Sequence, residues 1–271
     1  MPSEVRFSAI TGFRVVTAAL DDLADFYRAI GFAVGELTPI TPVELAVLGL
    51  DGGGFRRPMR LGASRVALDT FDRPGVPYPA DATACDLIFQ HLALVTDDAN
   101  AAWRRASDAG ATPISRGGPV TLPRSAGGVT AIKFRDPEGH PLEFLQFPPG
   151  TNPRWAGTGI MGVDHTAICV AEVRVSQSFY QNQGLSDGAR SLNEGPTQAQ
   201  LDGLDDVEVD IVPLNPPEKP PHLELLGYRR PRGMNHGAIA ANDVAATRIV
   251  WRADRDALLR DPDEHLHQLT R

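Results

Sequence analysis

The chain has 271 residues, of which 42% are hydrophobic, and its formal net charge is −8. This length suffices for one large or two small domains with buried cores, and the negative charge argues against a nucleic-acid partner. No apolar run approaches 18 residues and no basic-then-apolar stretch opens the chain, so neither a membrane span nor a signal peptide is expected. Because Cys85 and Cys169 make no disulfide framework, a cytoplasmic protein is the default expectation.

The first predicted structural unit, or module, covers about residues 8–75. Apolar residues from Leu20 to Ile30 recur at helical spacing, and Gly31 follows as a helix-ending residue. The glycine run 52–54 lacks the Gly-Lys-Ser/Thr ending of a phosphate loop, which favours a hairpin or lid. Strands are expected on both sides of these features.

The second module covers about residues 87–147. Its segment Phe89–Gly110 again shows a strand followed by a helix. We expect three further strands at Thr112–Ser115, Gly128–Phe134 and Pro141–Phe147, with a tight turn before the last. The proline-rich stretch Pro148–Pro153 that follows is the best internal boundary.

The third module covers about residues 160–230, and a fourth, truncated one covers about 235–271. In the first strand of the third module, His165, Ala167 and Cys169 fall on one face. We therefore predict an N-terminal half, residues 1–150, and a C-terminal half, residues 151–271, with two modules each.

Internal similarity supports this division. The segment Gly12–Gly31 aligns without gaps on His165–Gly184, with a Phe-Tyr pair and the final glycine in common. The turn sequences RDPEGHPLEFLQF and RDPDEHLHQLT also match, at residues 135–147 and 260–270. Self-similarity of this kind indicates repeated structural units, here in the order strand, helix and three strands.

Four side chains occupy corresponding strand positions in the repeats: His91, Glu143, His165 and Glu224. Imidazole nitrogens and carboxylate oxygens together suit a borderline or hard divalent ion. Both glutamates lie within apolar strands, where an inward carboxylate is costly without a cation. The sequence therefore predicts a site for one divalent ion, which could be Zn, Ni, Co, Mn or Fe.

The repeated helices, the DPEGHPLEF turn and the module pattern resemble the vicinal oxygen chelate superfamily, which contains glyoxalases, bleomycin resistance proteins and extradiol dioxygenases. The resemblance implies an α+β fold of tandem βαβββ modules, paired into cupped, barrel-like mixed sheets with flanking helices. It also implies that the first and last strands of each module hold the metal. In the first and fourth modules those positions carry Gly12, Ala67, Arg248 and Gln268.

The residues at these ligand positions favour one way of pairing the four modules. Pairing the second module with the third joins His91, Glu143, His165 and Glu224 in one cup, and leaves the first and fourth modules with no metal site. The two histidines must then lie within about 10 Å, given metal–ligand bonds of roughly 2 Å. A shifted register of the fourth module places His236 in the ligand position instead, with pairing of the third and fourth modules.

The ligand set suggests a reaction class. Four protein ligands leave an octahedral ion two positions for neighbouring substrate oxygens, and Glu143 or Glu224 could then abstract a proton from a nearby C–H bond. That chemistry indicates a lyase or isomerase acting on a small oxygenated metabolite. The alternatives are an Fe(II) extradiol-type dioxygenase and a protein that sequesters a small molecule without turnover.

Other residues carry weaker expectations. Phe89, Phe147 and Tyr228 could line a substrate pocket, although core packing explains each of them equally well. Arg14 and Arg248 occupy inward positions of the first and fourth modules, where Asp69 could pair with a buried arginine. We expect structural roles for His222, His265 and His267, a small-molecule substrate, and a monomer or homodimer.

Overall fold

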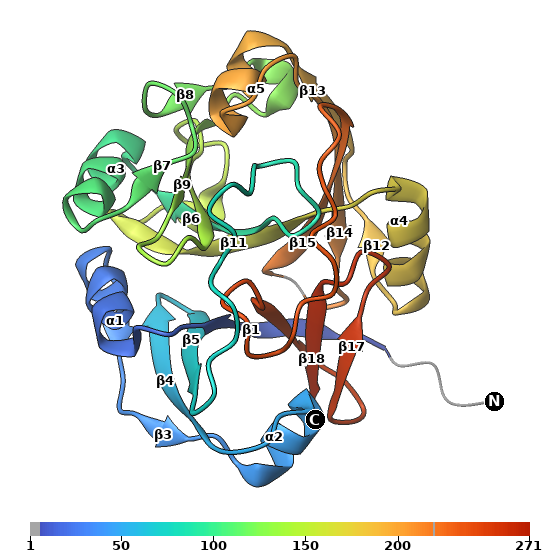
Figure 1. Ribbon diagram of the computed structural model, residues 1–271. Coiled ribbons are helices and arrows are strands. Elements are labelled where there is room, and N and C mark those ends of the chain that lie inside the picture. Colours follow the sequence, from blue (N-terminus) through green and yellow to red (C-terminus); the bar gives the residue numbers. More distant parts are fainter. Residues whose placement is uncertain (1–5, 219) are drawn as a thin grey trace.

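The computed structural model describes residues 6–218 and 220–271, which form two mixed sheets with flanking helices (Figure 1). This is the α+β architecture expected from the sequence. One sheet, here called the outer sheet, has the strand order β17-β18-β16-β1-β5-β4-β2, and β3 also pairs with β4. Its strands are β1 (Ala9–Val16), β2 (Ala33–Val34), β3 (Thr38–Pro39), β4 (Gly54–Leu61), β5 (Ser64–Phe71), β16 (Arg248–Arg252), β17 (Ala257–Arg260) and β18 (Leu266–Thr270).

The inner sheet has the order β12-β14-β15-β11-β6-β10-β9-β7, with β13 pairing β14 and β8 pairing β9. Its strands are β6 (Gln90–Thr96), β7 (Thr112–Pro113), β8 (Val120–Thr121), β9 (Thr130–Arg135), β10 (Pro141–Gln146), β11 (Ile160–Cys169), β12 (Ser186–Asp187), β13 (Ser191–Glu194), β14 (Glu208–Asn215) and β15 (His222–Arg230). The strands predicted for the second module correspond to β7, β9 and β10, with ends that differ by up to two residues.

Five α-helices flank the sheets, and none in the described part of the chain is long and apolar enough to cross a membrane. The expected amphipathic helix of the first module is present and ends before Gly31, whose φ of 104° suits glycine. The helix α2 was not predicted. The helices are α1 (Leu20–Ala29), α2 (Pro42–Leu48), α3 (Ala99–Asp108), α4 (Val173–Asn182) and α5 (Gly195–Asp202), with 3-10 turns η1 (Arg124–Ala126) and η2 (Pro153–Trp155).

The modules pair in a nested order. In the inner sheet β6 of the second module runs antiparallel to β11 of the third, and in the outer sheet β1 of the first runs antiparallel to β16 of the fourth. Each sheet therefore draws strands from both predicted halves of the chain. The segment predicted as the fourth module has three strands and no helix among its described residues. The division into halves at residue 150 stays a prediction.

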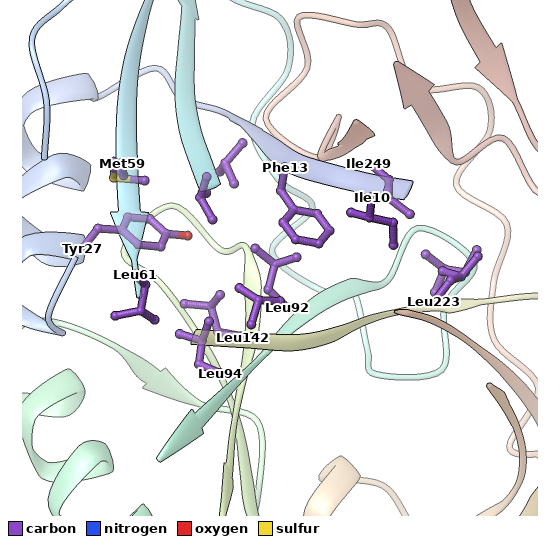
Figure 2. Packing of buried hydrophobic residues seen from close by; sticks show 14 of the residues in the cluster. Ile10, Phe13, Tyr27, Met59, Leu61, Leu92, Leu94, Leu142, Leu223 and Ile249 are labelled. Atoms are coloured by element: carbon purple, nitrogen blue, oxygen red, sulfur yellow. The ribbon is translucent and has the colours of Figure 1, made fainter. Parts of the chain in front are cut away.

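The main hydrophobic core lies between the two sheets (Figure 2). Side chains alternate along each strand, so Leu92 and Leu94 of β6 enter this core while His91 lies on the opposite face. Phe13 of β1 does the same in the outer sheet, and Arg14 lies on the other face. The two cups thus open on opposite sides of the molecule, and are called here the inner cup and the outer cup.

The repeated turn sequence links the second module to the first. Asp136 accepts hydrogen bonds from the backbone N–H groups of Glu138 and His140, both at 3.0 Å, and one from the hydroxyl of Tyr27. The His140 ring places Nε2 2.9 Å from the carbonyl oxygen of Val16. The turn therefore ties β10 to both α1 and β1.

The equivalent turn links the fourth module to the third in the same way. Asp261 accepts from the N–H groups of Asp263 and His265, both at 2.9 Å, and from the Tyr180 hydroxyl at 2.7 Å. Nε2 of His265 lies 2.9 Å from the carbonyl oxygen of Cys169. The structural role expected for His265 is therefore to hold the turn against β11.

Candidate metal centre

The four central strands of the inner sheet bring the predicted ligands together. His91 lies on β6, Glu143 on β10, His165 on β11 and Glu224 on β15, and these strands are neighbours in the order β15-β11-β6-β10. The ring centroids of His91 and His165 are 5.8 Å apart, well within the distance that the pairing required. The second and third modules thus place all four side chains in one cup.

The donor atoms of this cluster converge closely. Oε2 of Glu143 lies 2.9 Å from Nε2 of His91 and 3.8 Å from Nε2 of His165, while Oε2 of Glu224 lies 3.5 Å from the same His165 nitrogen. Both ring nitrogens of His91 are buried and have no well-aligned hydrogen bond within the described residues. Leaving such a group unpaired is costly, so this donor set fits a divalent cation held between the side chains.

Imidazoles and carboxylates in the cluster shift one another's pKa values. Burial alone would lower the pKa of His165, but the carboxylates of Glu224, Asp164 and Glu143 outweigh it and raise this pKa to about 9. Burial would likewise raise the pKa of Glu224, yet His165 and His222 lower it to about 2. The first shift shows that the surrounding carboxylates favour a positive charge at His165, and the second that the carboxylate of Glu224 stays ionised beside the imidazoles.

Two residues beside the ligands were not predicted to belong to the site. Asp164 places Oδ2 3.1 Å from Nδ1 of His165 and accepts a 2.9 Å hydrogen bond from the Trp155 indole. His222, for which we expected a structural role, lies with Nε2 3.2 Å from Oε1 of Glu224. Partners of this kind orient metal ligands in proteins. The two-residue period from His222 to Glu224 was a signal for the second contact.

A cavity of about 390 Å³ lies in front of the cluster. One wall is polar and buried: Lys133 forms a 2.6 Å ion pair with Asp202, which also accepts from the Gln198 amide at 2.9 Å. The Gln198 oxygen in turn accepts from Asn193 at 3.0 Å. The apolar part of the lining includes Leu122, Val129, Leu145, Phe147 and Leu201. A small molecule with a polar and an apolar side matches this lining.

The three aromatic residues proposed for the pocket lie in different places. Phe147 lines the cavity. Phe89 is fully buried beneath it, with its ring edge-on to His91 at 5.7 Å. Tyr228 lines a separate hollow of about 620 Å³ beside α4, where Arg229 is neutralised by Asp210. Core packing therefore explains Phe89, and Tyr228 lies outside the cavity of the candidate centre.

His236 is not part of the cluster. Its Nε2 lies 3.2 Å from Oδ2 of Asp86, in the segment between β15 and β16. The shifted register is not the one adopted, because β16 begins at Arg248 and pairs this residue with Arg14, just as His91 pairs with Ala167. Arg248 thus occupies the position that corresponds to His91.

The outer cup contains the predicted substitutions. The strand registers place Gly12, Ala67, Arg248 and Gln268 where the inner cup has His165, Glu224, His91 and Glu143. Arg248 is fully buried and donates to Asp69 at 2.6 Å, which confirms the partner expected for it. In the described ranges, no group of metal-ligating side chains was found in the outer sheet.

Comparison with known proteins decides the family. The family model described as Glyoxalase/Bleomycin resistance protein/Dioxygenase superfamily matches residues 9–144, which is half of the chain. The chain belongs to this superfamily. None of the curated proteins compared with it gives a match.

Solved structures of this superfamily share the fold of the chain. Glyoxalase I from Zea mays has 13% identity and a TM-score of 0.59, with 97% of this chain and 92% of that chain covered. A point mutant of the same enzyme gives a TM-score of 0.61 at 13% identity, with the same coverage. A putative dioxygenase from Bacillus subtilis has 14% identity and a TM-score of 0.58, with 97% and 85% covered. At such low identity these likenesses establish the fold alone.

Proposed function

We propose that this superfamily member is a divalent-metal-dependent enzyme that acts on a small oxygenated metabolite, as a lyase or isomerase. The observation that carries the proposal is the convergence of His91, Glu143, His165 and Glu224 on one wall of the inner cavity. Two imidazoles and two carboxylates suit Zn, Ni, Co, Mn or Fe.

The residues of the cup have distinct tasks in this proposal. A divalent ion held by the four side chains supplies Lewis-acid polarisation of neighbouring substrate oxygens. Glu143 and Glu224 are the candidate bases, because each carries a carboxylate at the cavity wall within reach of a bound substrate. The His222 contact holds one oxygen of Glu224, and the polar wall at Lys133 and Asn193 would orient the substrate.

The comparisons support this reaction class as an analogy. The superfamily name includes glyoxalases, and the chain shares its fold with glyoxalase I from Zea mays over nearly its whole length. A shared fold hosts several chemistries, so the argument for function rests on the cluster of side chains. Cytoplasmic location and a monomeric or dimeric state remain predictions from the sequence.

A specific observation favours a second candidate, an Fe(II)-dependent extradiol-type dioxygenase. His91, His165 and Glu143 form a group, without Glu224, whose ligand atoms lie within 4.8 Å of one another, and Asp164, His165 and His222 form a second such group. The second carboxylate, Glu224, is engaged by His222 at 3.2 Å. Two histidines and one carboxylate are the ligand set of non-haem Fe(II) oxygenases.

Elemental analysis of protein purified in metal-free buffer and then offered each metal tests the proposal. We expect about one tightly bound divalent ion per chain in the wild type and in His236→Ala, and its loss in His91→Ala. The His236 variant is the control, because it removes a partly buried imidazole that lies beside one carboxylate, Asp86, outside the cluster. A wild-type chain that binds no metal would overturn the proposal and favour a protein that sequesters its ligand without turnover.

The bound metal then separates the two reactions. For a lyase or isomerase we expect deuterium from D₂O to enter a C–H bond next to a carbonyl of the substrate, with no oxygen consumed. For the dioxygenase we expect iron, and oxygen uptake with catechols. Glu143→Gln removes the candidate base and a ligand together, whereas Asn193→Ala leaves the metal in place and changes only the substrate wall.

A further inference from the structure

The outer cup has a cavity of its own, of about 230 Å³, on the face of the outer sheet that carries Arg14. Its walls come from β1, β4 and β18 and from the helix α2. The polar lining includes Arg14, Glu44, Arg56 and Gln268, and the apolar lining includes Val43 and Val47. This cavity lies on the side of the molecule opposite to the candidate metal centre.

Two carboxylates in this cup are already fully engaged. Asp69 accepts from Nε and Nη2 of Arg56, both at 2.7 Å, and from Arg248 at 2.6 Å. Glu44 accepts from the same Arg56 guanidinium at 2.7 and 3.0 Å. Arg56 and Arg248 thus balance the charges of Glu44 and Asp69, and Arg14 is an additional cation.

Nε of Arg14 is buried and has no hydrogen-bond partner within residues 6–218 and 220–271. Burial lowers the pKa of Arg14 to about 10, to which the neighbouring Arg56 contributes against the opposing effect of Asp69. Asp256 also lines the cavity but is exposed to solvent. Arg14 as a whole is half-buried and lines the cavity, so an anion that enters there can pair with its guanidinium.

The same cavity also has a buried hydrogen-bond acceptor without a partner, on Gln268. Gln268 is 3% exposed, and its Oε1 has no hydrogen-bond partner among the described residues. The amide orientation is determined by its neighbour, because Nε2 donates to the carboxylate of Glu44 at 2.6 Å and a carboxylate can only accept. The cavity therefore offers an acceptor at Gln268 and a cationic donor at Arg14.

We propose that the outer cup is a second ligand site, which binds a small carboxylate with a neighbouring hydroxyl or amino group. The planar guanidinium of Arg14 receives the carboxylate through paired hydrogen bonds, and Oε1 of Gln268 accepts from the neighbouring group. The apolar side chains of Val43 and Val47 on α2 cover the carbon skeleton. The site uses no metal, so it goes beyond the function proposed for the inner cup.

Calorimetric titration with L-lactate tests this site. Lactate also has the oxygens to chelate a metal, so the titration uses EDTA-treated protein in a His91→Ala background. Propionate matches lactate without the hydroxyl, lactamide lacks the charge, and inorganic phosphate is an anion of different shape. We expect saturable lactate binding, about 2–10-fold weaker binding of propionate, and no binding of lactamide.

Variants assign the binding to the cup. Arg14→Gln should weaken lactate binding by roughly 10–100-fold, the usual effect of losing a charge-assisted pair. Gln268→Leu should make lactate and propionate bind alike. Arg65→Gln is the matched control, because it removes an exposed arginine from the neighbouring strand β5.

Three results would overturn the proposal: no saturable binding of lactate to the His91→Ala protein, equal binding by Arg14→Gln, or tighter binding of phosphate than of lactate. Folding of each variant is checked by its thermal midpoint. Arg14→Gln relieves the repulsion from Arg56, so we expect its midpoint to stay within a few degrees of the wild-type value. None of these outcomes depends on the metal centre, so failure here leaves the inner-cup proposal intact.

Discussion

The two cups have the same backbone plan and opposite chemistry. At corresponding positions of paired strands, the inner cup has His91 and Glu143 and the outer cup has Arg248 and Gln268. The inner cup collects carboxylates around imidazoles, whereas the outer cup pairs Arg56 and Arg248 with Glu44 and Asp69 and adds the unpaired Arg14. Pairing of the modules therefore determines where a site lies, and the side chains at that site determine whether it attracts a cation or an anion.

The largest expected effect is a loss of stability when a buried charge of the outer cup is removed. Asp69 is fully buried and joins two arginines, so Asp69→Asn should lower the free energy of unfolding by about 3–5 kcal/mol in urea titrations. The exposed pair of Asp205 and Arg116 is the control, and Asp205→Asn should have a much smaller effect, because solvent screens an exposed pair. Equal effects of the two substitutions would contradict a difference between buried and exposed pairs.

The second prediction concerns a substitution that places the residue type of an outer-cup position at the corresponding position of the inner cup. Glu143→Gln introduces the side chain found at the corresponding position 268, and removes a negative ligand. Losing even an outer-shell partner weakens metal binding by about 10–100-fold, so we expect at least about 100-fold weaker binding, measured by competition with a chelator. Gln268→Leu should bind metal as the wild type does. Unchanged affinity in Glu143→Gln would remove this residue from the ligand set.

The third prediction concerns a strand position at which the outer sheet has a histidine and the inner sheet has a leucine. His267 occupies the position that corresponds to Leu142, and its Nδ1 accepts a 2.9 Å hydrogen bond from Trp251. Nε2 therefore carries the proton and donates to the Tyr180 oxygen at 2.9 Å. The ring is neutral in this arrangement.

Burial lowers the pKa of His267 from 6.5 to about 4, partly offset by Asp261. Between these values the unfolded chain binds a proton that the folded chain does not, so stability should fall as the pH drops from 6.5 towards 4, by about 3 kcal/mol in total. Above pH 6.5 this contribution vanishes. Urea titrations at several pH values should show a shallower slope for His267→Gln than for the wild type. Identical slopes would exclude His267 as the source.

The smallest expected effect concerns the N-terminal caps of α2 and α5, the helices that cover the outer and the inner cup. Thr41 caps α2 by accepting a 3.2 Å hydrogen bond from the Glu44 N–H group, whereas α5 has no side-chain cap at Glu194. Thr41→Ala should cost about 1 kcal/mol. Hydrogen exchange should accelerate in α2 and stay unchanged in α5, whose Leu201 lines the inner cavity. Acceleration in both helices would show that the cups are coupled.

The sequence favoured pairing of the second module with the third, because that pairing joins four metal-ligating side chains in one cup, but it left pairing of the third with the fourth through His236 open. The two-residue period of strands indicated which side chains share a face. The closeness of His91 and His165 was expected from the family resemblance together with one of the two pairings. The same reasoning gave the positions of Gly12 and Ala67 in the outer cup. The sequence was sufficient for α1, whose apolar residues follow a helical period.

Contacts between distant segments could not be predicted in this way. Glu44 lies on a short helix with no strong period, and its partner Gln268 is 224 residues away. The pair of Lys133 and Asp202 joins a strand of the second module to a helix of the third, at positions that the repeat does not relate. Asp164 was missed because it precedes His165 on a strand and approaches it only through the local geometry of its side chain.

The nested pairing has a consequence for the order of folding during synthesis. All strands of the inner sheet lie between residues 90 and 230, so that sheet can form while the C-terminal end of the chain is still being made. The outer sheet cannot, because Thr11 on β1 meets Val250 on β16 across 239 residues. Until β16 has been synthesised, one edge of β1 is unpaired and can pair with another nascent chain. We therefore expect the outer sheet to be the part of the molecule that is most prone to misassembly and most dependent on chaperones.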